Sequence, residues 1–385
     1  MKPLEGNRVT LLKNGEQFFP ALVTAIESAR VDVRLETYIF EDDATGNLVA
    51  AALSRAARRG VKVRVLIDGL GSRHTPVAFF DAMRAAGATV LVFRPDHKLF
   101  SFKRGRLRRV HRKIALIDNR VGFVGGINII DDLNNSLSDF PRYDYAVQLE
   151  GPLLALMYPV VHTLWRWVAW QRFRKEDVGP RPPTLVPPPA GSHLAAFVVR
   201  DNFRHRRAIE RMYLQAIGTA RERVLLMNPY FLPGRHLRRA LVTAAARGVR
   251  VTILLQGRAD HPILQMATRA LFGQLLGAGI EIFEYEKSML HGKVAAVDDQ
   301  WATVGSSNLD PCSLFLNREA NVVVYDTGFA RELRGSVESE IASGAVLCRV
   351  EHWKQRPLLQ RVQSWLAYGF ARWVAGVIGF AKQWE

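Results

Sequence analysis

One sequence pattern occurs twice in this chain, and the two copies stand in the same internal register. The matched residues are His111, Lys113, Asp118 and Asn128 in the first copy and His291, Lys293, Asp298 and Asn308 in the second. Every matched pair differs by 180 in residue number, as from 111 to 291. A glycine and a second small residue, Gly126 or Ser306, precede each asparagine. Two copies in register predict two related halves with one architecture.

Helical and strand patterns alternate around both copies. Apolar residues recur at helical spacing in some segments and at every second position in others, and glycines follow several of the helical segments. The predicted helices cover residues 15–29, 47–59, 76–86, 209–220 and 237–247, and the predicted strands cover 31–38, 61–68, 89–93, 223–227 and 249–255. This alternation predicts an α/β fold.

The histidine and lysine of each copy are predicted to share one face of a strand. Residues 113–117 and 293–297 are apolar and partly β-branched, which predicts two strands, each followed by a turn and another strand. Side chains two positions apart on a strand point the same way, so an imidazole lies beside an ammonium group. The small residues after the second strand let a ligand approach the backbone, and the asparagine adds a donor.

Two such faces, brought together by the repeat, predict a site for a phosphodiester. The lysines neutralise the phosphoryl oxygens, one histidine attacks phosphorus, and the other protonates the leaving alcohol. This chemistry requires no metal ion and no cofactor. The alternative is that His111 and His291 are ordinary core or surface histidines, as a lone histidine usually is, but their matched positions argue against it.

The doubled pattern His-x-Lys-x4-Asp-x6-Gly-(Gly/Ser)-x-Asn resembles the phospholipase D superfamily, and the resemblance covers nearly the whole chain. Residues 290–295, 301–310 and 316–321 are similar to bacterial cardiolipin synthases, most closely the short B type, which lacks N-terminal membrane spans. The resemblance implies two pseudo-symmetric phospholipase D-like lobes. Each would be a mixed β-sheet flanked by helices, with the active site at the lobe interface.

The resemblance also implies roles for the basic and amide residues. His111 is expected to form a phosphatidyl-histidine intermediate, and His291 to act as general acid and then as base. This assignment rests on analogy, and the reverse stays open. The residues implied in phosphate binding are Lys113, Lys293, Asn128, Asn308 and Ser306.

Four acidic residues complete the predicted site. Glu319 and Asp144 are implied to support the histidines through hydrogen bonds. Asp118 and Asp298 belong to the predicted catalytic set of the two motifs, although the family implies that both mainly hold strand and turn.

The repeat predicts a division of the chain into four segments. These are a first lobe at residues 1–178, a linker at 179–190, a second lobe at 191–350 and a membrane-associating tail at 351–385. Six prolines predict a stiff, extended linker. The apolar run at 153–170 is interrupted by His162 and Arg166, so we expect a helix packed on the first lobe and not a membrane span.

The net positive charge of the chain predicts a polyanionic partner. The chain has 53 lysines and arginines against 36 acidic residues, a net charge of +17, which suits nucleic acid or an anionic membrane surface. Residues 98–113 hold eight basic residues and no acidic one, interleaved with apolar side chains. They are predicted to meet anionic lipid, the alternative being a solvated charge run. Residues 358–384 predict an amphipathic helix rich in tryptophan that lies on a membrane; a core helix or a short span are the alternatives.

The predicted cellular location rests on targeting and membrane-spanning segments that the sequence patterns do not show. The N-terminal residues have no apolar stretch of a signal peptide, and no segment reaches about 18 uninterrupted apolar residues. Cys312 and Cys348 are too few for a disulfide framework, which is typical of a reducing compartment. We therefore expect a peripheral protein on the cytoplasmic face of the bacterial cell membrane.

These features predict a cardiolipin synthase, a phosphatidyltransferase that joins one phosphatidylglycerol to the hydroxyl of a second phospholipid and releases glycerol. A hydrolytic phospholipase D, a phosphodiesterase or a nuclease of the same superfamily is one alternative. A basic membrane- or DNA-binding protein without activity is another, but the intact histidine and lysine pairs argue against it. The tryptophan-rich tail favours lipid, so no nucleic-acid partner is expected. The sequence predicts neither the acceptor nor the oligomeric state.

Neutralising Arg104, Arg106, Arg108 and Arg109 together is expected to weaken binding to anionic vesicles. Each basic residue near such a surface contributes about 1 kcal/mol. Vesicle sedimentation of the quadruple variant beside the wild type measures the loss. Unchanged binding would contradict a lipid-facing basic segment.

Overall fold

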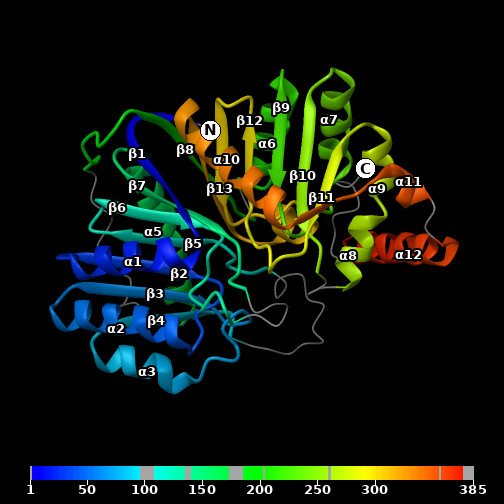
Figure 1. The fold of residues 1–385 in the computed structure, drawn as a ribbon. Helices are drawn as coiled ribbons and strands as arrows, with labels where there is room; N and C mark the ends of the chain where they lie inside the picture. Colours follow the sequence, from blue (N-terminus) through cyan, green and yellow to red (C-terminus); the bar gives the residue numbers. More distant parts are fainter. Residues whose placement is uncertain are drawn as a thin grey trace.

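In the computed structural model, the strands of both halves form one continuous mixed β-sheet (Figure 1). The structure describes residues 2–95, 108–134, 140–172, 185–202, 204–258, 262–354 and 357–375. Within these ranges, 15 strands follow the order β15-β11-β10-β9-β12-β13-β14-β8-β1-β7-β6-β5-β2-β3-β4. Helices flank the sheet, so the predicted α/β class with two pseudo-symmetric lobes is confirmed.

The order of strands is the same in both halves when it is followed outward from the centre. The first half contains β1 (Leu4–Lys13), β2 (Asp32–Thr37), β3 (Lys62–Asp68), β4 (Thr89–Phe93), β5 (Lys113–Ile117), β6 (Val121–Gly125) and β7 (Tyr145–Glu150). The second half contains β8 (His193–Arg200), β9 (Arg223–Met227), β10 (Arg250–Gln256), β11 (Glu281–Tyr285), β12 (Val294–Val297), β13 (Trp301–Gly305), β14 (Glu319–Tyr325) and the short edge strand β15 (Ala345–Leu347). In each half the three strands β2-β3-β4 or β9-β10-β11 are parallel, and the motif strands β5 and β12 run antiparallel to their neighbours.

The two halves meet at the antiparallel pair β1 and β8, with Leu4 opposite Ala195 and an irregularity before Asn7. Asn7 is buried, donates to the carbonyl of Leu4 and accepts from the amide of Leu153. Its side chain therefore ties the central strand to the helix that follows β7. The sequence patterns above do not predict β1 or β8.

The helices are α1 (Asn14–Glu27), α2 (Ala44–Arg58), α3 (Val77–Ala85), α5 (Leu154–Gln171), α6 (Ala208–Thr219), α7 (Arg235–Ala246), α8 (Pro262–Arg269), α9 (Phe272–Gly277), α10 (Thr327–Gly344), α11 (Val350–Lys354) and α12 (Leu358–Ala375), with a π-helical turn at Cys312–Leu316. The predicted helices and strands of the repeat agree with these bounds to within a few residues. Helix α10 falls outside every predicted element.

Helices cover both faces of the first-lobe sheet because its strands alternate buried residues between faces. Val63 and Val65 of β3 pack with α1 and α2, whereas Leu66 packs with Trp165 of α5 on the other face. The predicted helix at 153–170 is thus confirmed as a helix packed on the first lobe. Among the helices of the described ranges, none is both long enough and apolar enough to cross a bilayer.

A buried polar cluster joins the lobes behind the site. The hydroxyls of Tyr143 and Tyr145 lie 2.7 Å apart, and that of Tyr145 lies 2.7 Å from Ser336 of α10. On the same helix Glu340 accepts from the hydroxyl of Tyr285 at 2.8 Å. Because each hydroxyl has a partner, these tyrosines can be buried between the lobes without leaving polar atoms unsatisfied.

The proposed linker and tail are described only in part. Residues 179–184 and 376–385 lie outside the described residues. Residues 185–190 have no helix or strand, and the carbonyls of Leu185 and Ala190 accept from Asn119 and Arg8 of the first lobe. The division into four segments stays a prediction.

Candidate active site

Each motif histidine comes just before a central strand and is hydrogen-bonded to the opposite half. The backbone amide of His111 donates to the carbonyl of Arg318 at 3.0 Å, and that of His291 donates to the carbonyl of Tyr143 at 2.8 Å. Arg318 and Tyr143 come directly before Glu319 and Asp144 in the sequence. The backbone pairing therefore brings each histidine beside an acidic residue of the other lobe.

A carboxylate from the opposite lobe accepts from Nδ1 of each imidazole. The Glu319 oxygens lie 3.0 and 3.1 Å from Nδ1 of His111, and Oδ2 of Asp144 lies 2.5 Å from Nδ1 of His291. Both carboxylates are fully buried. A hydrogen bond at Nδ1 fixes the tautomer and leaves Nε2 of each ring for reaction with a substrate.

Both motif lysines are buried beside their histidines. Nζ of Lys113 donates to the carbonyl of His111 at 2.8 Å, and Lys293 makes the matching bond to the carbonyl of His291. Only 4% of Lys113 and none of Lys293 is exposed. An ammonium group has three N–H donors, so each lysine keeps donors for an anion after this bond is made.

Burial favours the neutral form of both imidazoles. It lowers the pKa of His111 despite the opposing charge of Glu319. Burial and the charge of Lys293 lower the pKa of His291 to about 3, although Asp144 opposes the shift. Burial alone would raise the pKa of Asp144 and Glu319, but the neighbouring histidines and lysines outweigh it and lower both. Neutral imidazole is the form that can act as a nucleophile or base.

Burial lowers the pKa of both motif lysines toward neutral pH. Burial, followed by the charge of Lys293, lowers the pKa of Lys113 to about 7. Burial lowers the pKa of Lys293 to about 8, against the raising effect of Asp144 and Glu319. Two ammonium groups in one buried site disfavour each other, so an incoming anion would relieve this repulsion.

The residue that follows β6 is Gly126, whereas the residue that follows β13 is Ser306, and the difference has a steric reason. Ser306 donates to Glu319 at 2.5 Å and accepts from the amide of Ala320. At the matching place in the first half, a Cβ added to Gly126 would lie 2.2 Å from Oδ1 of Asp144. Glycine is thus required where the shorter carboxylate approaches the backbone.

The two asparagines are placed differently. Asn128 lines the cavity described below, and its Oδ1 accepts from the amide of Ile39 at 3.1 Å, which turns the amide nitrogen toward other partners. Asn308 is buried beside Asp310, and its Oδ1 has no hydrogen-bond partner among the residues that the structure describes. The structure therefore brings Asn128, and not Asn308, to the cavity wall.

Asp118 and Asp298 lie at the far ends of their strands and do not line the cavity. Each accepts from three consecutive backbone amides, those of residues 30–32 and 221–223, at 2.7 to 2.9 Å. Both begin two-residue turns with positive φ, which aspartate and asparagine tolerate. The structure therefore places both residues away from the cavity, and these contacts agree with the implied role in holding strand and turn.

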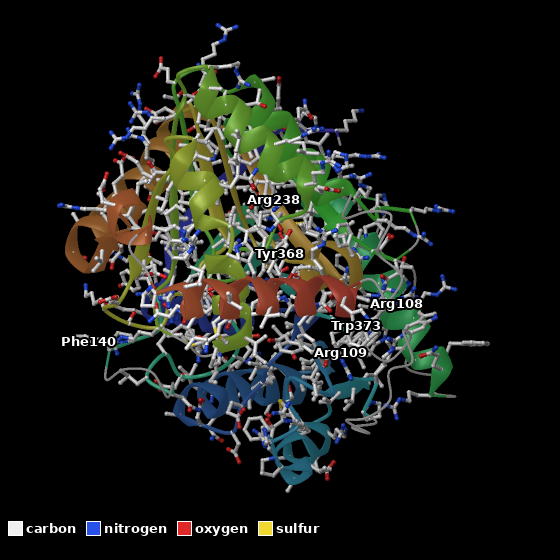
Figure 2. The ribbon with its side chains drawn as sticks, turned by 90° about the vertical axis from the view of Figure 1, so that its right-hand side faces the viewer. Arg108, Arg109, Phe140, Arg238, Tyr368 and Trp373 are labelled. Carbon is white, nitrogen blue, oxygen red and sulfur yellow. The ribbon has the colours of Figure 1, made fainter. Side chains whose placement is uncertain are left out.

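Both histidines line one cavity of about 720 Å³. Arg109 and Asn128 add polar groups, and much of the remaining wall is apolar, including Ile39, Leu232, Ile263, Met289, Leu316 and Phe370. Helix α12 crosses this side of the molecule in front of the two lobes (Figure 2). The cavity thus combines a polar end, which bears the histidines, Arg109, Asn128 and Asp310, with walls suited to hydrocarbon.

Two residues near His111, Tyr38 and Asp68, are missing from the sequence prediction. The ring of Tyr38 lies 5.0 Å from the imidazole, edge-on. Buried Asp68 accepts from the amide of Val110 at 2.9 Å and lies 3.5 Å from Arg109. Both Tyr38 and Asp68 stand at or just beyond the ends of predicted strands, the edge where α/β folds place ligands, and that position was the only available signal.

The basic segment at 98–113 is only partly described. Residues 98–107 lie outside the described residues, so their predicted contact with lipid is untested. Arg112 is 2% exposed and makes a bidentate ion pair with Glu36. Including Arg112 in a lipid-facing surface was wrong, because a buried, paired guanidinium cannot reach a membrane. Lys113 is also buried, and it lies in the site beside His111, so it does not face lipid either.

In the part of the chain that the structure describes, no group of three or more histidine, cysteine or carboxylate side chains is arranged to hold a metal ion.

The sequence of this chain is similar to those of cardiolipin synthases. The family model described as cardiolipin synthase, PLD-like domain, matches residues 22–136 and 213–341. Cardiolipin synthase B of Escherichia coli strain K12 is 40% identical over 383 residues, covering 98% of this chain and 90% of that protein. Cardiolipin synthase A of Salmonella arizonae is 32% identical over 377 residues, covering 96% of this chain and 76% of that protein.

The fold alone is shared more widely. The crystal structure of a phosphatidylserine synthase from Haemophilus influenzae matches with a TM-score of 0.71 at 14% identity, covering 98% of this chain and 95% of that chain. A polyphosphate kinase from Porphyromonas gingivalis matches with a TM-score of 0.56 at 17% identity, covering 96% of this chain and 56% of that one.

Replacing Asp118 by alanine is expected to lower the free energy of unfolding by about 1–3 kcal/mol, because three backbone amides lose their acceptor. Turnover per folded molecule should stay close to wild type. Urea unfolding and activity measured on the same samples separate the two effects. Asp81→Ala, at an exposed ion pair, is the control and should cost little. Lost turnover with unchanged stability would contradict the structural role.

The lowered lysine pKa predicts a pH dependence of stability. Between pH 7 and about 10.5 the unfolded chain holds a proton on Lys113 that the folded chain releases, so stability should rise with pH over this window. Lys113→Met should reduce this rise, whereas Lys62→Met, at an exposed position, should not. Thermal unfolding midpoints from pH 6 to 10 test it. Equal slopes in the wild type and Lys113→Met would refute the lowered pKa.

Proposed function

Because the chain belongs to the phospholipase D-like family of cardiolipin synthases, and is thus a phosphatidyltransferase, we propose that it transfers a phosphatidyl group through a histidine intermediate. The donor is phosphatidylglycerol, the leaving group is glycerol, and the acceptor is the hydroxyl of a second phospholipid. The observation that carries the proposal is the pair of histidines, each bonded at Nδ1 to a carboxylate of the other lobe, in one partly apolar cavity.

In the first step, Nε2 of His111 attacks the phosphorus of phosphatidylglycerol. A P–N bond forms, the bond from phosphorus to the glycerol headgroup oxygen breaks, and protonated His291 gives its proton to that oxygen. Glu319 stabilises the positive charge that develops on the imidazole of His111. The order of the two histidines follows the family analogy.

In the second step, His291 removes the proton from the acceptor hydroxyl. The resulting oxygen attacks phosphorus, the P–N bond breaks, and His111 returns to its neutral form. The same residue thus serves first as acid and then as base, which requires that it take up and give back one proton per cycle. The bound phosphodiester anion favours protonated His291 by charge, opposing the burial that keeps it neutral in the free protein.

Phosphate binding falls to Lys113, Lys293 and Asn128. The two lysines are fixed by the histidine carbonyls and offer their remaining donors to the phosphoryl oxygens. Donors held in place before the reaction stabilise charge that develops in the transition state without reorganising. Glu319, Asp144 and Ser306 act as positioning residues, because their side chains bond to the histidines or to one another.

The walls of the cavity favour a lipid donor over nucleic acid. Hydrocarbon can pack on Ile39, Leu232 and Phe370, whereas a polynucleotide would need a groove of basic and stacking groups. We place the reaction at a membrane surface for this reason. The cytoplasmic face of the bacterial cell membrane stays the proposed location.

Incubation of the protein with vesicles of labelled phosphatidylglycerol, with and without a second lipid, is expected to give cardiolipin and glycerol, identified by mass spectrometry. His111→Ala and His291→Ala should each lower the rate by roughly 10³-fold or more, since each removes a nucleophile or an acid–base group. Phosphatidic acid as the sole product would replace the synthase with a hydrolase.

The covalent phosphatidyl-histidine intermediate can be tested directly, with a label on the phosphatidyl group. After acid-free quenching, labelled lipid should remain covalently attached to the wild type and to His291→Ala but not to His111→Ala. Label retained on His111→Ala and lost from His291→Ala would reverse the two roles. His236→Ala, at an exposed position of α7, is the matched control and should leave rate and label unchanged.

A further inference from the structure

Helix α12 packs on the second lobe through its small side chains. Ser364, Ala367 and Tyr368 are buried, and Ala367 and Tyr368 belong to the hydrophobic core of that lobe. The guanidinium groups of Arg238 and Arg372 each lie 5.9 Å from the Tyr368 ring. Figure 2 shows Tyr368 directed toward Arg238, on the side of α12 that faces the second lobe. The helix is thus anchored by one tyrosine and a line of small residues.

The large apolar side chains of α12 point the other way. A surface helix of a globular protein normally buries its apolar stripe. Here the stripe is exposed, between 44% and 73% of each residue: Leu358, Leu359, Val362, Trp365, Leu366, Phe370 and Trp373. The prediction of an amphipathic helix at 358–384 holds for the described part, and its core-helix alternative is wrong for the large residues. An apolar face this continuous marks an interaction surface.

This face continues into the wall of the active-site cavity. Phe370 and Ala371 of α12 line the cavity together with Pro262, Ile263 and Leu264 of α8. Ile263 is itself 55% exposed, so the apolar surface passes from the outer face to the cavity over α8 as well. A group that covers α12 would therefore touch the mouth of the cavity.

The chemistry of the face fits a lipid monolayer. Between Leu358 and Ala375 there is no acidic residue, and Arg361 and Arg372 are exposed. Tryptophan with basic residues beside an apolar stripe is typical of helices that lie at the level of lipid headgroups.

We propose that α12 and α8 form a lipid-contacting rim that admits phospholipid to the cavity laterally, its headgroup moving toward the histidines while its acyl chains stay along Ile263 and Phe370. The inference rests on the proposed function and adds to it the route and the surface by which the substrate arrives. It also gives Phe370 a role in holding the lipid portion of the donor, which a water-soluble phosphodiester lacks.

The double variant Trp365→Ser/Leu366→Ser tests the rim, because both residues are exposed and neither lines the cavity. Turnover is measured on phosphatidylglycerol vesicles and on dihexanoyl-phosphatidylglycerol below its critical micelle concentration. We expect vesicle turnover to fall about tenfold or more, since burying one large apolar side chain is worth at least that factor. Turnover of the soluble lipid should stay within about twofold, which also shows that the variant is folded.

Val31→Ser is the matched control, since Val31 is 63% exposed and precedes β2 at the end remote from Tyr38 and the histidines. Equal vesicle turnover in the double variant and the wild type would overturn the rim, as would an equal fall on both substrates. A wild-type dimer that the variant converts to a monomer in size-exclusion chromatography would assign the face to a second copy and overturn it too. If the wild type turned over neither lipid, the proposed function would fail, while co-sedimentation with phosphatidylglycerol vesicles would still decide the rim.

Discussion

The structure depends on two hydrogen bonds that cross between the lobes, from Nδ1 of each motif histidine to a carboxylate of the opposite half. Neither lobe alone holds a complete site, because His111 needs Glu319 and His291 needs Asp144. The backbone bonds beside them extend the same pairing, and the central strands β1 and β8 keep the halves in register. Any shift between the lobes would separate an imidazole from its carboxylate and leave buried charge unpaired, which is costly. The lobe interface is therefore part of the site.

The site concentrates charge where water is excluded. Two carboxylates and two lysines are buried beside two imidazoles whose side chains are only 13% and 12% exposed, and the lysines have a pKa near neutrality as a result. Such a cluster is unfavourable for the empty protein and becomes favourable when an anion enters, since the anion pairs with both ammonium groups. Binding of a phosphodiester and readiness for its chemistry are thus linked by the same electrostatics.

The two halves share a plan, but the cavity between them is not symmetric. Gly126 leaves room for the short Asp144, whereas Ser306 bonds to the longer Glu319. Helices α8 and α12 of the second lobe give the cavity its apolar wall on one side. Two matched histidine–lysine pairs beside one hydrocarbon wall suit a reaction in which a lipid phosphodiester enters in one orientation.

The sequence by itself determined the repeat, the strands and helices around each motif, and the pairs of histidines and lysines, because these follow from local periodicity and from residue types at fixed spacing. The supporting acids Glu319 and Asp144 were implied by the family resemblance. Only the tertiary structure decided which carboxylate serves which histidine, since that pairing joins residues about 200 or 150 positions apart across the lobe interface. It also showed that Asp118 and Asp298 bond to backbone amides away from the cavity and that Arg112 pairs with buried Glu36. A spacing pattern shows neither burial nor backbone contacts. The same holds for α12: its periodicity predicted an apolar stripe, but the packing of Ala367 and Tyr368 on the second lobe decided that the stripe faces outward.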